Sequence, residues 1–269
     1  MEKAEFGNSV LYHGDTFDIL PTLNDGEIDM VASDPPYASE TFGKCTECDW
    51  DKPIPLTEFW QLIEYKAKPS ANIVLFGNMK FAFDLIDSNR KGFRYDLVWA
   101  KNNRVGFLNA KKMVMRSHES ILLFGKPGYM AAATYNPLKI PGGRPVVKRG
   151  KTRKVDGVYP PVEAATTVSD GTLYPHSVLA FDHDRGGNQP EACLHPTMKP
   201  LLLMGYLLTL YSNPGDLVLD PFAGSGTTLE AAMKLGRRFV GIERERRYYE
   251  IACRRLEEAY RKRKARFAG

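Results

Sequence analysis

Several features are scarce in this sequence of 269 residues, and each scarcity excludes a class of protein. Four cysteines are too few for a disulfide scaffold in a chain of this length, so we expect reduced thiols. The longest apolar run, Leu201–Tyr211, is shorter than the roughly 18 residues that a membrane span needs, and it predicts a buried helix. The first residues mix charges and lead into no apolar stretch, which predicts no secretory or transit leader, no membrane partner and a cytoplasmic protein.

Disordered, collagen-like and coiled-coil chains are also excluded, because 43% of the residues are hydrophobic and 26% are charged, as in ordinary soluble domains. No internal repeat is present. The length favours one large α/β unit or two small ones.

Charge is unevenly distributed, although its net value is only +5. Residues 137–154 hold seven Lys or Arg and no acid, and residues 254–269 hold seven Lys or Arg against two Glu. The rest of the chain is therefore net acidic. Two basic segments on an acidic body indicate a polyanionic partner, usually nucleic acid, with a solvent-facing charge run as the alternative.

Short β-rich runs alternate with stretches of helical spacing. Seven runs are typical of buried strands: residues 9–12, 28–33, 72–76, 95–100, 120–124, 216–219 and 238–242. Helices are expected at residues 56–68, 81–89, 200–211, 228–235 and 245–263. This alternation predicts an α/β fold with a seven-stranded, doubly wound, mostly parallel sheet.

The alternation stops in a Gly-, Pro-, Thr- and Lys-rich segment that contains the first basic run. Such a segment is typical of an insertion with its own task. We therefore expect one catalytic domain made of residues 1–125 and 195–269, and a recognition insertion at residues 126–194.

A glycine loop follows the predicted strand at residues 216–219. Gly224 and Gly226 let the backbone approach a ligand closely, and the N–H groups near Thr227 can hold a carboxylate or phosphate. A P-loop would need Lys after the second glycine, and a dinucleotide fingerprint would need Gly or Ala where Leu229 stands. The loop therefore indicates another nucleotide-like ligand, with a plain glycine turn as the alternative.

Glu243 ends the next predicted strand, at the same edge of the sheet as the glycine loop. A carboxylate there can accept hydrogen bonds from both hydroxyls of a ribose. An ordinary surface glutamate is the alternative.

The motif Asp34-Pro35-Pro36-Tyr37 directly follows the predicted strand at residues 28–33. An exocyclic amine shares its lone pair with its ring and is a poor nucleophile, so it needs acceptors for its hydrogens. The Asp34 carboxylate and the Pro35 carbonyl can accept them, and two prolines hold the backbone extended. The ring of Tyr37 offers a stacking surface for a planar base and tolerates a nearby cation. A structural Pro-Pro turn is the alternative.

These two motifs, with the acidic one first, resemble the β class of S-adenosylmethionine-dependent amino DNA methyltransferases. The resemblance extends over most of the chain and is greatest for the phage-associated and orphan branch. Further segments similar to the family are Gly14-Asp15, Trp99 with Lys101, Phe107–Lys112, Arg116–Glu119 and His195–Pro200.

The resemblance implies a Rossmann-like methyltransferase fold and a role for each matching residue. Asp34, Pro35, Pro36 and Tyr37 would hold the target amine. The residues expected around the cofactor S-adenosylmethionine are Asp220, Phe222, Gly224, Gly226 and Thr227, with Glu243 at its ribose, Asp15 near its adenine, and Thr197 and Lys199 near its methionine carboxylate.

Cysteine contributes neither a metal site nor a nucleophile in this interpretation. Cys45 and Cys48 have zinc-like spacing, but one pair supplies only two of four ligands, so no metal is expected. No Pro-Cys dipeptide occurs, so covalent attack on cytosine C5 has no candidate thiolate. Residues 38–52, which follow Tyr37, are expected to form a mobile loop over the active site.

We therefore predict a site-specific DNA methyltransferase that transfers a methyl group to N6 of a flipped-out adenine, as an orphan enzyme or in a restriction–modification system. Asp as the first residue of the acidic motif favours adenine, following the family's habit. N4 of cytosine is the first alternative. A non-catalytic DNA-binding module and a flavin or nicotinamide oxidoreductase are more distant ones.

Double-stranded DNA is the expected partner, and a homodimer is left open. The basic insertion would supply the phosphate contacts. The residues assigned to this role are Arg144, Lys148, Arg149, Lys151, Arg153 and Lys154.

Overall fold

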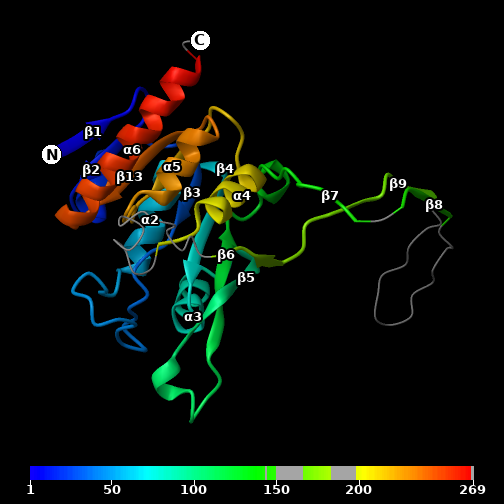
Figure 1. The fold of residues 1–269 in the computed structure, drawn as a ribbon. Helices are drawn as coiled ribbons and strands as arrows, with labels where there is room; N and C mark the ends of the chain where they lie inside the picture. Colours follow the sequence, from blue (N-terminus) through cyan, green and yellow to red (C-terminus); the bar gives the residue numbers. More distant parts are fainter. Residues whose placement is uncertain (143, 150–165, 183–197, 268–269) are drawn as a thin grey trace. The chain divides into compact units, whose positions relative to one another are not determined.

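The computed structural model of the chain describes all residues except 143, 150–165, 183–197, 268 and 269. Within these residues, nine strands form one sheet in the order β1-β2-β13-β12-β3-β4-β6-β5-β11 (Figure 1). Strands β2, β13, β12, β3 and β4 run parallel, whereas β6 is antiparallel to both of its neighbours. The bounds are β1 Glu2–Glu5, β2 Val10–His13, β3 Ile28–Ser33, β4 Ala67–Gly77, β5 Phe93–Val105, β6 Arg116–Phe124, β11 Val178–Ala180, β12 Leu217–Asp220 and β13 Arg238–Glu243.

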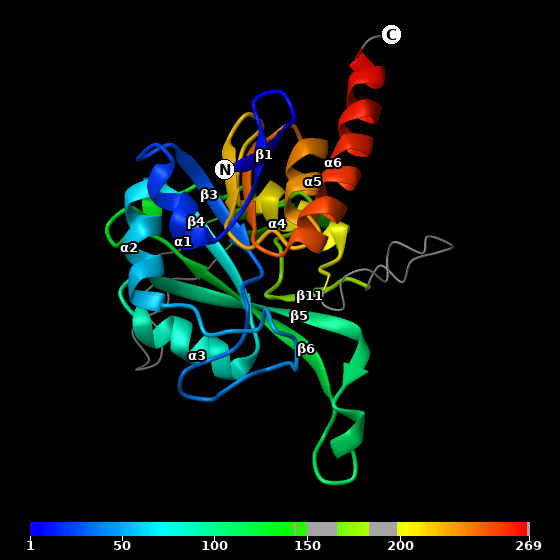
Figure 2. The ribbon, with the colours of Figure 1, turned by 90° about the vertical axis from the view of Figure 1, so that its left-hand side faces the viewer.

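Helices cover both faces of this sheet. Figure 2 shows α1, α2 and α3 on one face and α4, α5 and α6 on the other. Of the helices in the described residues, none is both long and apolar enough to cross a membrane. The bounds are α1 Thr16–Ile19, α2 Leu56–Lys66, α3 Met79–Ser88, α4 Leu201–Tyr211, α5 Thr227–Lys234 and α6 Arg246–Phe267.

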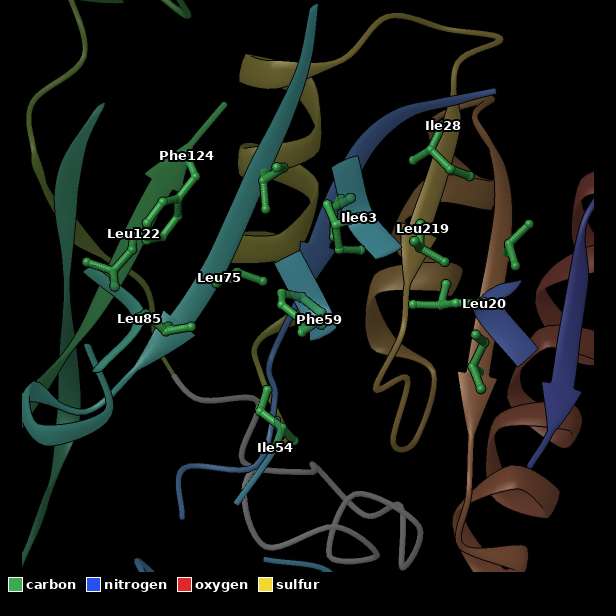
Figure 3. Packing of buried hydrophobic residues seen from close by; sticks show 14 of the residues in the cluster. Leu20, Ile28, Ile54, Phe59, Ile63, Leu75, Leu85, Leu122, Phe124 and Leu219 are labelled. Carbon is green, nitrogen blue, oxygen red and sulfur yellow. The ribbon is translucent and has the colours of Figure 1, made fainter. Parts of the chain in front are cut away.

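The two helical layers explain why the central strands are apolar on both faces. Met30, Val31 and Ala32 are consecutive in β3, so their side chains alternate between the faces, and all three are fully buried. Figure 3 shows one of the two apolar layers, where Phe59 and Ile63 of α2 pack among side chains of the sheet. Because helices cover both faces of these central strands, the strands hold the residues at their carboxyl ends, which form the candidate site, in place.

The predicted fold class is confirmed, and all seven predicted strands and five predicted helices are present; β3 has the predicted ends, and the ends of the other elements are shifted. The sheet has nine strands instead of seven because β1 and β11 add to its edges. Their three or four residues, like the single turn of α1, are too short to display a hydrophobic period.

The described residues between 137 and 176 form a second compact unit, separate from the unit of residues 1–136 and 177–269. It contains two antiparallel strand pairs, β7 (Ile140–Pro141) with β10 (Thr172–Leu173) and β8 (Val146–Arg149) with β9 (Thr166–Ser169). Its described residues include no buried hydrophobic side chain. The insertion limits at 125/126 and 194/195 stay a prediction, and the second lies outside the described residues.

Candidate active site

A cavity of about 1020 Å³ lies where the carboxyl ends of the central strands meet. The chain leaves the neighbouring strands β12 and β3 in opposite directions, towards β13 and towards β4, and such a reversal is where open α/β sheets bind ligands. The hydroxyl of Ser33 donates to Oδ1 of Asp220 at 2.6 Å and links the two strands at this point. The wall combines the segments after β2, β3, β12 and β13, at residues 15–17, 34–37, 220–225 and 243–245.

The glycine loop is held in shape by Glu243. Its Oε2 accepts the N–H of Gly224 at 2.7 Å, and its Oε1 accepts the N–H of Glu245 at 2.7 Å. Gly224 and Gly226 both have positive φ angles, +53° and +80°, which favour glycine. The carboxylate at the end of β13 is therefore directly bonded to the loop after β12.

Burial raises the pKa of both carboxyl groups on this side of the cavity. The pKa of Glu243 rises to about 7 because the side chain is buried, against the opposing effect of the two backbone N–H groups. The pKa of Asp220 rises to about 6 for the same reason, against hydrogen bonds from Ser33 and Thr228. Acidic groups that titrate near neutral pH are typical of functional sites.

The acidic motif after β3 is joined to residues from three other parts of the chain. The ammonium of Lys199 donates to Oδ2 of Asp34 at 2.5 Å and lies 3.3 Å from Oε2 of Glu119. Lys101 pairs with the other oxygen of Glu119 at 2.5 Å. The hydroxyl of Tyr37 donates to Oδ1 of Asp34 at 2.6 Å. Two carboxylates and two ammonium groups thus form one buried network at the wall of the cavity.

The network sets the ionisation of its members. Burial raises the pKa of Asp34, and the charge of Lys199 opposes that rise. At Glu119 burial acts in the same direction, but the charges of Lys199 and Lys101 outweigh it and lower the pKa to about 2. Although burial alone would lower the pKa of Lys199, Asp34 and Glu119 hold it above its ordinary value. Lys199 therefore stays charged beside Asp34.

Three comparisons with known proteins agree with this geometry. The family model described as DNA methylase, N6_N4_Mtase, matches residues 28–254. The chain belongs to this DNA methylase family.

Individual relatives are similar over nearly their whole length. The Type II methyltransferase M2.DpnII of Streptococcus pneumoniae is 28% identical over 92% of this chain and 89% of its own. The crystal structure of the M1.HpyAVI–SAM complex is 26% identical with a TM-score of 0.58, covering 91% of this chain and 98% of that one. The cytosine-N4-specific PvuII DNA methyltransferase, at 17% identity and a TM-score of 0.65, covers 95% of this chain and 92% of its own and shares the fold.

The methylase is thus a DNA methyltransferase that uses S-adenosylmethionine. The donor set of the cavity fits this cofactor: an aromatic ring at Phe222, a buried carboxylate at Glu243 and a glycine backbone at Gly224. Asp15 and Thr227 line the same cavity, and Asp15 Oδ1 also accepts the N–H of Phe17 at the start of α1.

The structure brings most of the predicted site residues of the methylase together. The cavity wall includes Asp15, Asp34, Pro35, Pro36, Tyr37, Lys199, Asp220, Phe222, Gly224, Thr227 and Glu243. Thr197 lies outside the described residues. The Lys199 amine bonds Asp34 and Glu119, and its expected place near the methionine carboxylate stays a prediction.

Gly226 is expected around the cofactor, and that role stays a prediction. It does not line the cavity, and a Cβ added there would lie 3.0 Å from the Cβ of Ala252 in α6. Gly226 is therefore needed for the packing of the loop against a helix.

The expected DNA-contacting residues belong to the second unit, of which only part is described. Arg144 is exposed, and Lys148 and Arg149 lie in β8 without described side chains. Lys151, Arg153 and Lys154 lie outside the described residues. As for metals, no group of three His, Cys, Asp or Glu suited to an ion occurs in the described part of the chain.

Sequence reasoning missed the roles of Glu119 and Lys101. Both stand in segments that resemble the family, but nothing in their spacing relates them to Asp34 or Lys199. Asp51 was also missed: it is fully buried, and its carboxylate accepts the N–H groups of Ala38 and Cys45 at 2.9 and 3.0 Å. The loop at residues 38–52 is thus organised around one aspartate.

Proposed function

We propose that this methylase transfers the methyl group of S-adenosylmethionine to the N6 amine of adenine in double-stranded DNA. The observation that carries the proposal is the position of Asp34 in the cavity wall that also contains the glycine loop and Glu243. The amine acceptor and the cofactor residues thus line one cavity.

The bound cofactor supplies an electrophilic methyl group, and the protein's task is to prepare the amine. The Asp34 carboxylate and the Pro35 carbonyl accept the hydrogens of the amine, which turns its nitrogen lone pair towards the methyl donor. Lys199 and Tyr37 hold the two oxygens of Asp34, so the carboxylate is fixed before the base arrives.

The same carboxylate can take the proton that the nitrogen loses after transfer. Burial raises the pKa of Asp34, which makes its carboxylate a better proton acceptor than an exposed aspartate. The Tyr37 ring stacks on Phe81, with centroids 5.7 Å apart, and the Lys199 ammonium lies over the ring, 5.5 Å from its centroid. A base would therefore meet the part of the ring that these two groups leave open.

We favour adenine because the first residue of the acidic motif is Asp34, and the family's habit associates Asp at this position with N6 of adenine. Cytosine N4 remains the alternative, and it would use the same residues in the same way. A binding module without catalysis is disfavoured by the complete set of Asp34, Gly224 and Glu243. A homodimer and a cytoplasmic location stay predictions.

The test replaces Asp34 and follows transfer and cofactor binding separately. In Asp34→Asn an amide donor replaces one carboxylate oxygen, so methyl transfer to DNA should fall by at least about 100-fold. The affinity for S-adenosylmethionine should stay within about twofold by calorimetry, because Asp34 does not belong to the loop that Glu243 holds. Digested DNA from the wild-type reaction should contain N6-methyladenine.

Asp96→Asn is the matched control, since Asp96 is exposed on β5 and does not line the cavity. It should leave transfer unchanged. Substantial activity in Asp34→Asn would remove Asp34 from the mechanism, and N4-methylcytosine in the product would move the substrate to the alternative.

A further inference from the structure

A hairpin of the main unit extends beyond the sheet and ends in exposed apolar side chains. Its strands are β5 and β6, which pair as far out as Val105 with Arg116, and residues 106–115 form the tip (Figure 2). Leu108 is 96% exposed, Val114 93%, Phe107 77% and Met113 64%. Soluble proteins rarely leave so many large apolar side chains together in water unless they bind something.

The charge around the tip indicates what binds there. Residues 97–118 contain no Asp or Glu. Of their basic residues, Lys101 pairs with Glu119 at the cavity wall, and the other four are Arg104, Lys111, Lys112 and Arg116. Apolar side chains among cations complement a ligand with a charged exterior and an apolar interior. A DNA duplex has this construction, because phosphates surround its stacked bases. A second copy of this hairpin would instead oppose positive charge to positive charge.

The hairpin also begins at the active site. Asn103, Val105 and Arg116 line the cavity that contains Asp34, so the tip starts at the rim of that cavity. Glu119, which holds Lys199, lies three residues further along β6. DNA whose base reaches Asp34 therefore lies within reach of the tip.

We propose that the apolar tip of the β5–β6 hairpin inserts into the duplex beside the target base and fills the space that the base leaves. This proposal rests on the proposed function, since it presumes a base that is rotated out of a duplex. A flipped base loses its stacking, and an apolar side chain in its place restores part of that contact. Lys111 and Lys112 would hold the flanking phosphates.

The experiment compares two substrates that differ only in the cost of flipping. The recognition site is first read by modification-sensitive sequencing of DNA methylated by the wild-type protein. One oligonucleotide duplex then carries the site intact, and a second carries an abasic position opposite the target base, which already weakens its pairing. Single-turnover methylation is measured with the wild type and with the Phe107→Ala/Leu108→Ala variant.

The variant should lose at least about tenfold in rate on the intact duplex and stay within about twofold of the wild type on the abasic duplex. Fluorescence of 2-aminopurine at the target position should rise with the wild type and not with the variant. Tyr65→Ala is the matched control, because Tyr65 is a large exposed side chain in α2 that does not line the cavity. It should behave as the wild type on both duplexes.

Equal loss on both duplexes, or no loss on either, would overturn the insertion. So would a change in oligomeric state of the variant by sedimentation, which would assign the tip to a second copy of the chain. Failure of the wild type to methylate any DNA would instead refute the proposed function, and the two failures are therefore distinguishable.

Discussion

At the scale of single residues, Glu243 holds the glycine loop and is also expected to bind the ribose of the cofactor. Each of its oxygens accepts one backbone N–H, which leaves a second lone pair on each for a hydroxyl. Burial raises its pKa to about 7, so the group changes its protonation state near neutral pH. Cofactor binding should therefore depend on pH near neutrality.

The direction of this pH dependence follows from which form of Glu243 accepts hydrogen bonds. The ionised carboxylate accepts on both oxygens, whereas the protonated group donates from one, so binding selects the ionised form. Below about pH 7 the affinity for S-adenosylmethionine should weaken by up to about tenfold per pH unit, and above it the affinity should be level. Calorimetry between about pH 5.5 and 8.5 measures this dependence.

Two variants distinguish the contribution of Glu243 to the pH profile from the contributions of its acidic neighbours. Glu243→Gln should weaken binding at high pH by about 1.5 to 3 kcal/mol and remove the inflection near pH 7, leaving any contribution of Asp220 near pH 6. Glu245→Gln should keep the inflection and move it to lower pH, because the charge of Glu245 helps to raise the pKa of Glu243. A flat wild-type profile would contradict this role of Glu243.

The sequence predicted which strand ends meet at the site, but it did not predict the ion pairs of Asp34 with its neighbours. Asp34 and Glu243 end strands, and parallel strands bring their carboxyl ends to one edge, so their proximity follows from the pattern. The contact between Lys199 and Asp34 joins positions 165 residues apart, through a side chain that precedes a helix. No periodicity in the sequence predicts such a contact.

At the scale of elements, the glycine loop depends on the packing of α5 against α6. Gly226 precedes α5 with a φ of +80°, and its missing Cβ leaves room for Ala252 of α6. Gly226→Ala should therefore lower the free energy of unfolding for two reasons. The left-handed backbone costs about 1 to 2 kcal/mol, and the close contact with Ala252 adds a further amount. Urea unfolding measures the sum.

Gly215 provides the control for the backbone effect. Its φ is +89°, but nothing lies within 4 Å of an added Cβ. Gly215→Ala should therefore cost only the backbone strain, and the difference between the two variants reports the contact with Ala252. Adding Ala252→Gly to Gly226→Ala should recover that difference, apart from the cost of a glycine within α6. Equal losses in Gly215→Ala and Gly226→Ala would contradict the packing argument.

Elements were predictable where burial leaves an apolar run or an apolar period in the sequence, and not where it leaves neither. Strand β3 is apolar on both faces and was found with its correct ends. Strand β5 was expected at residues 95–100 and extends to Val105. Residues 101–104 are Lys, Asn, Asn and Arg, which give no apolar pattern, and this part of the strand pairs only with β6. The same property hid the hairpin whose tip is proposed to enter DNA.

At the scale of the whole molecule, the two basic segments of the sequence differ in how free their charges are. In the C-terminal segment, Arg255 already has partners within the main unit. It donates to the carbonyl of Ser225 at 2.6 Å and pairs with Glu230 at 2.7 Å. Lys262 pairs with Glu258 along α6. Part of this segment therefore stabilises the fold, and more of the phosphate contacts should come from residues 137–154 and from the hairpin.

Salt dependence can count these contacts. Each phosphate neutralised on duplex DNA contributes about −0.9 to the slope of log affinity against log salt concentration. Replacing Lys148, Arg149 and Lys151 together by alanine should reduce the magnitude of the slope by about 2 to 3, measured by fluorescence anisotropy on a labelled duplex. Affinity should fall equally on cognate and unrelated sequences if these residues contact only phosphates, and unequally if an arginine reads a guanine edge.

Substitutions in the β5–β6 hairpin should reduce the magnitude of the salt slope independently of those in the insertion. Lys111→Ala/Lys112→Ala should lower the magnitude of the slope by about 2 if both lysines contact phosphates beside the inserted tip. Because the two sets belong to separate units of the chain, their effects on the slope should add in the combined variant. Cofactor affinity should stay constant throughout, since neither set lies in the glycine loop or at Glu243. An unchanged slope in the triple variant would show that the insertion's charges only face solvent, and the phosphate contacts would then lie on the hairpin and on α6.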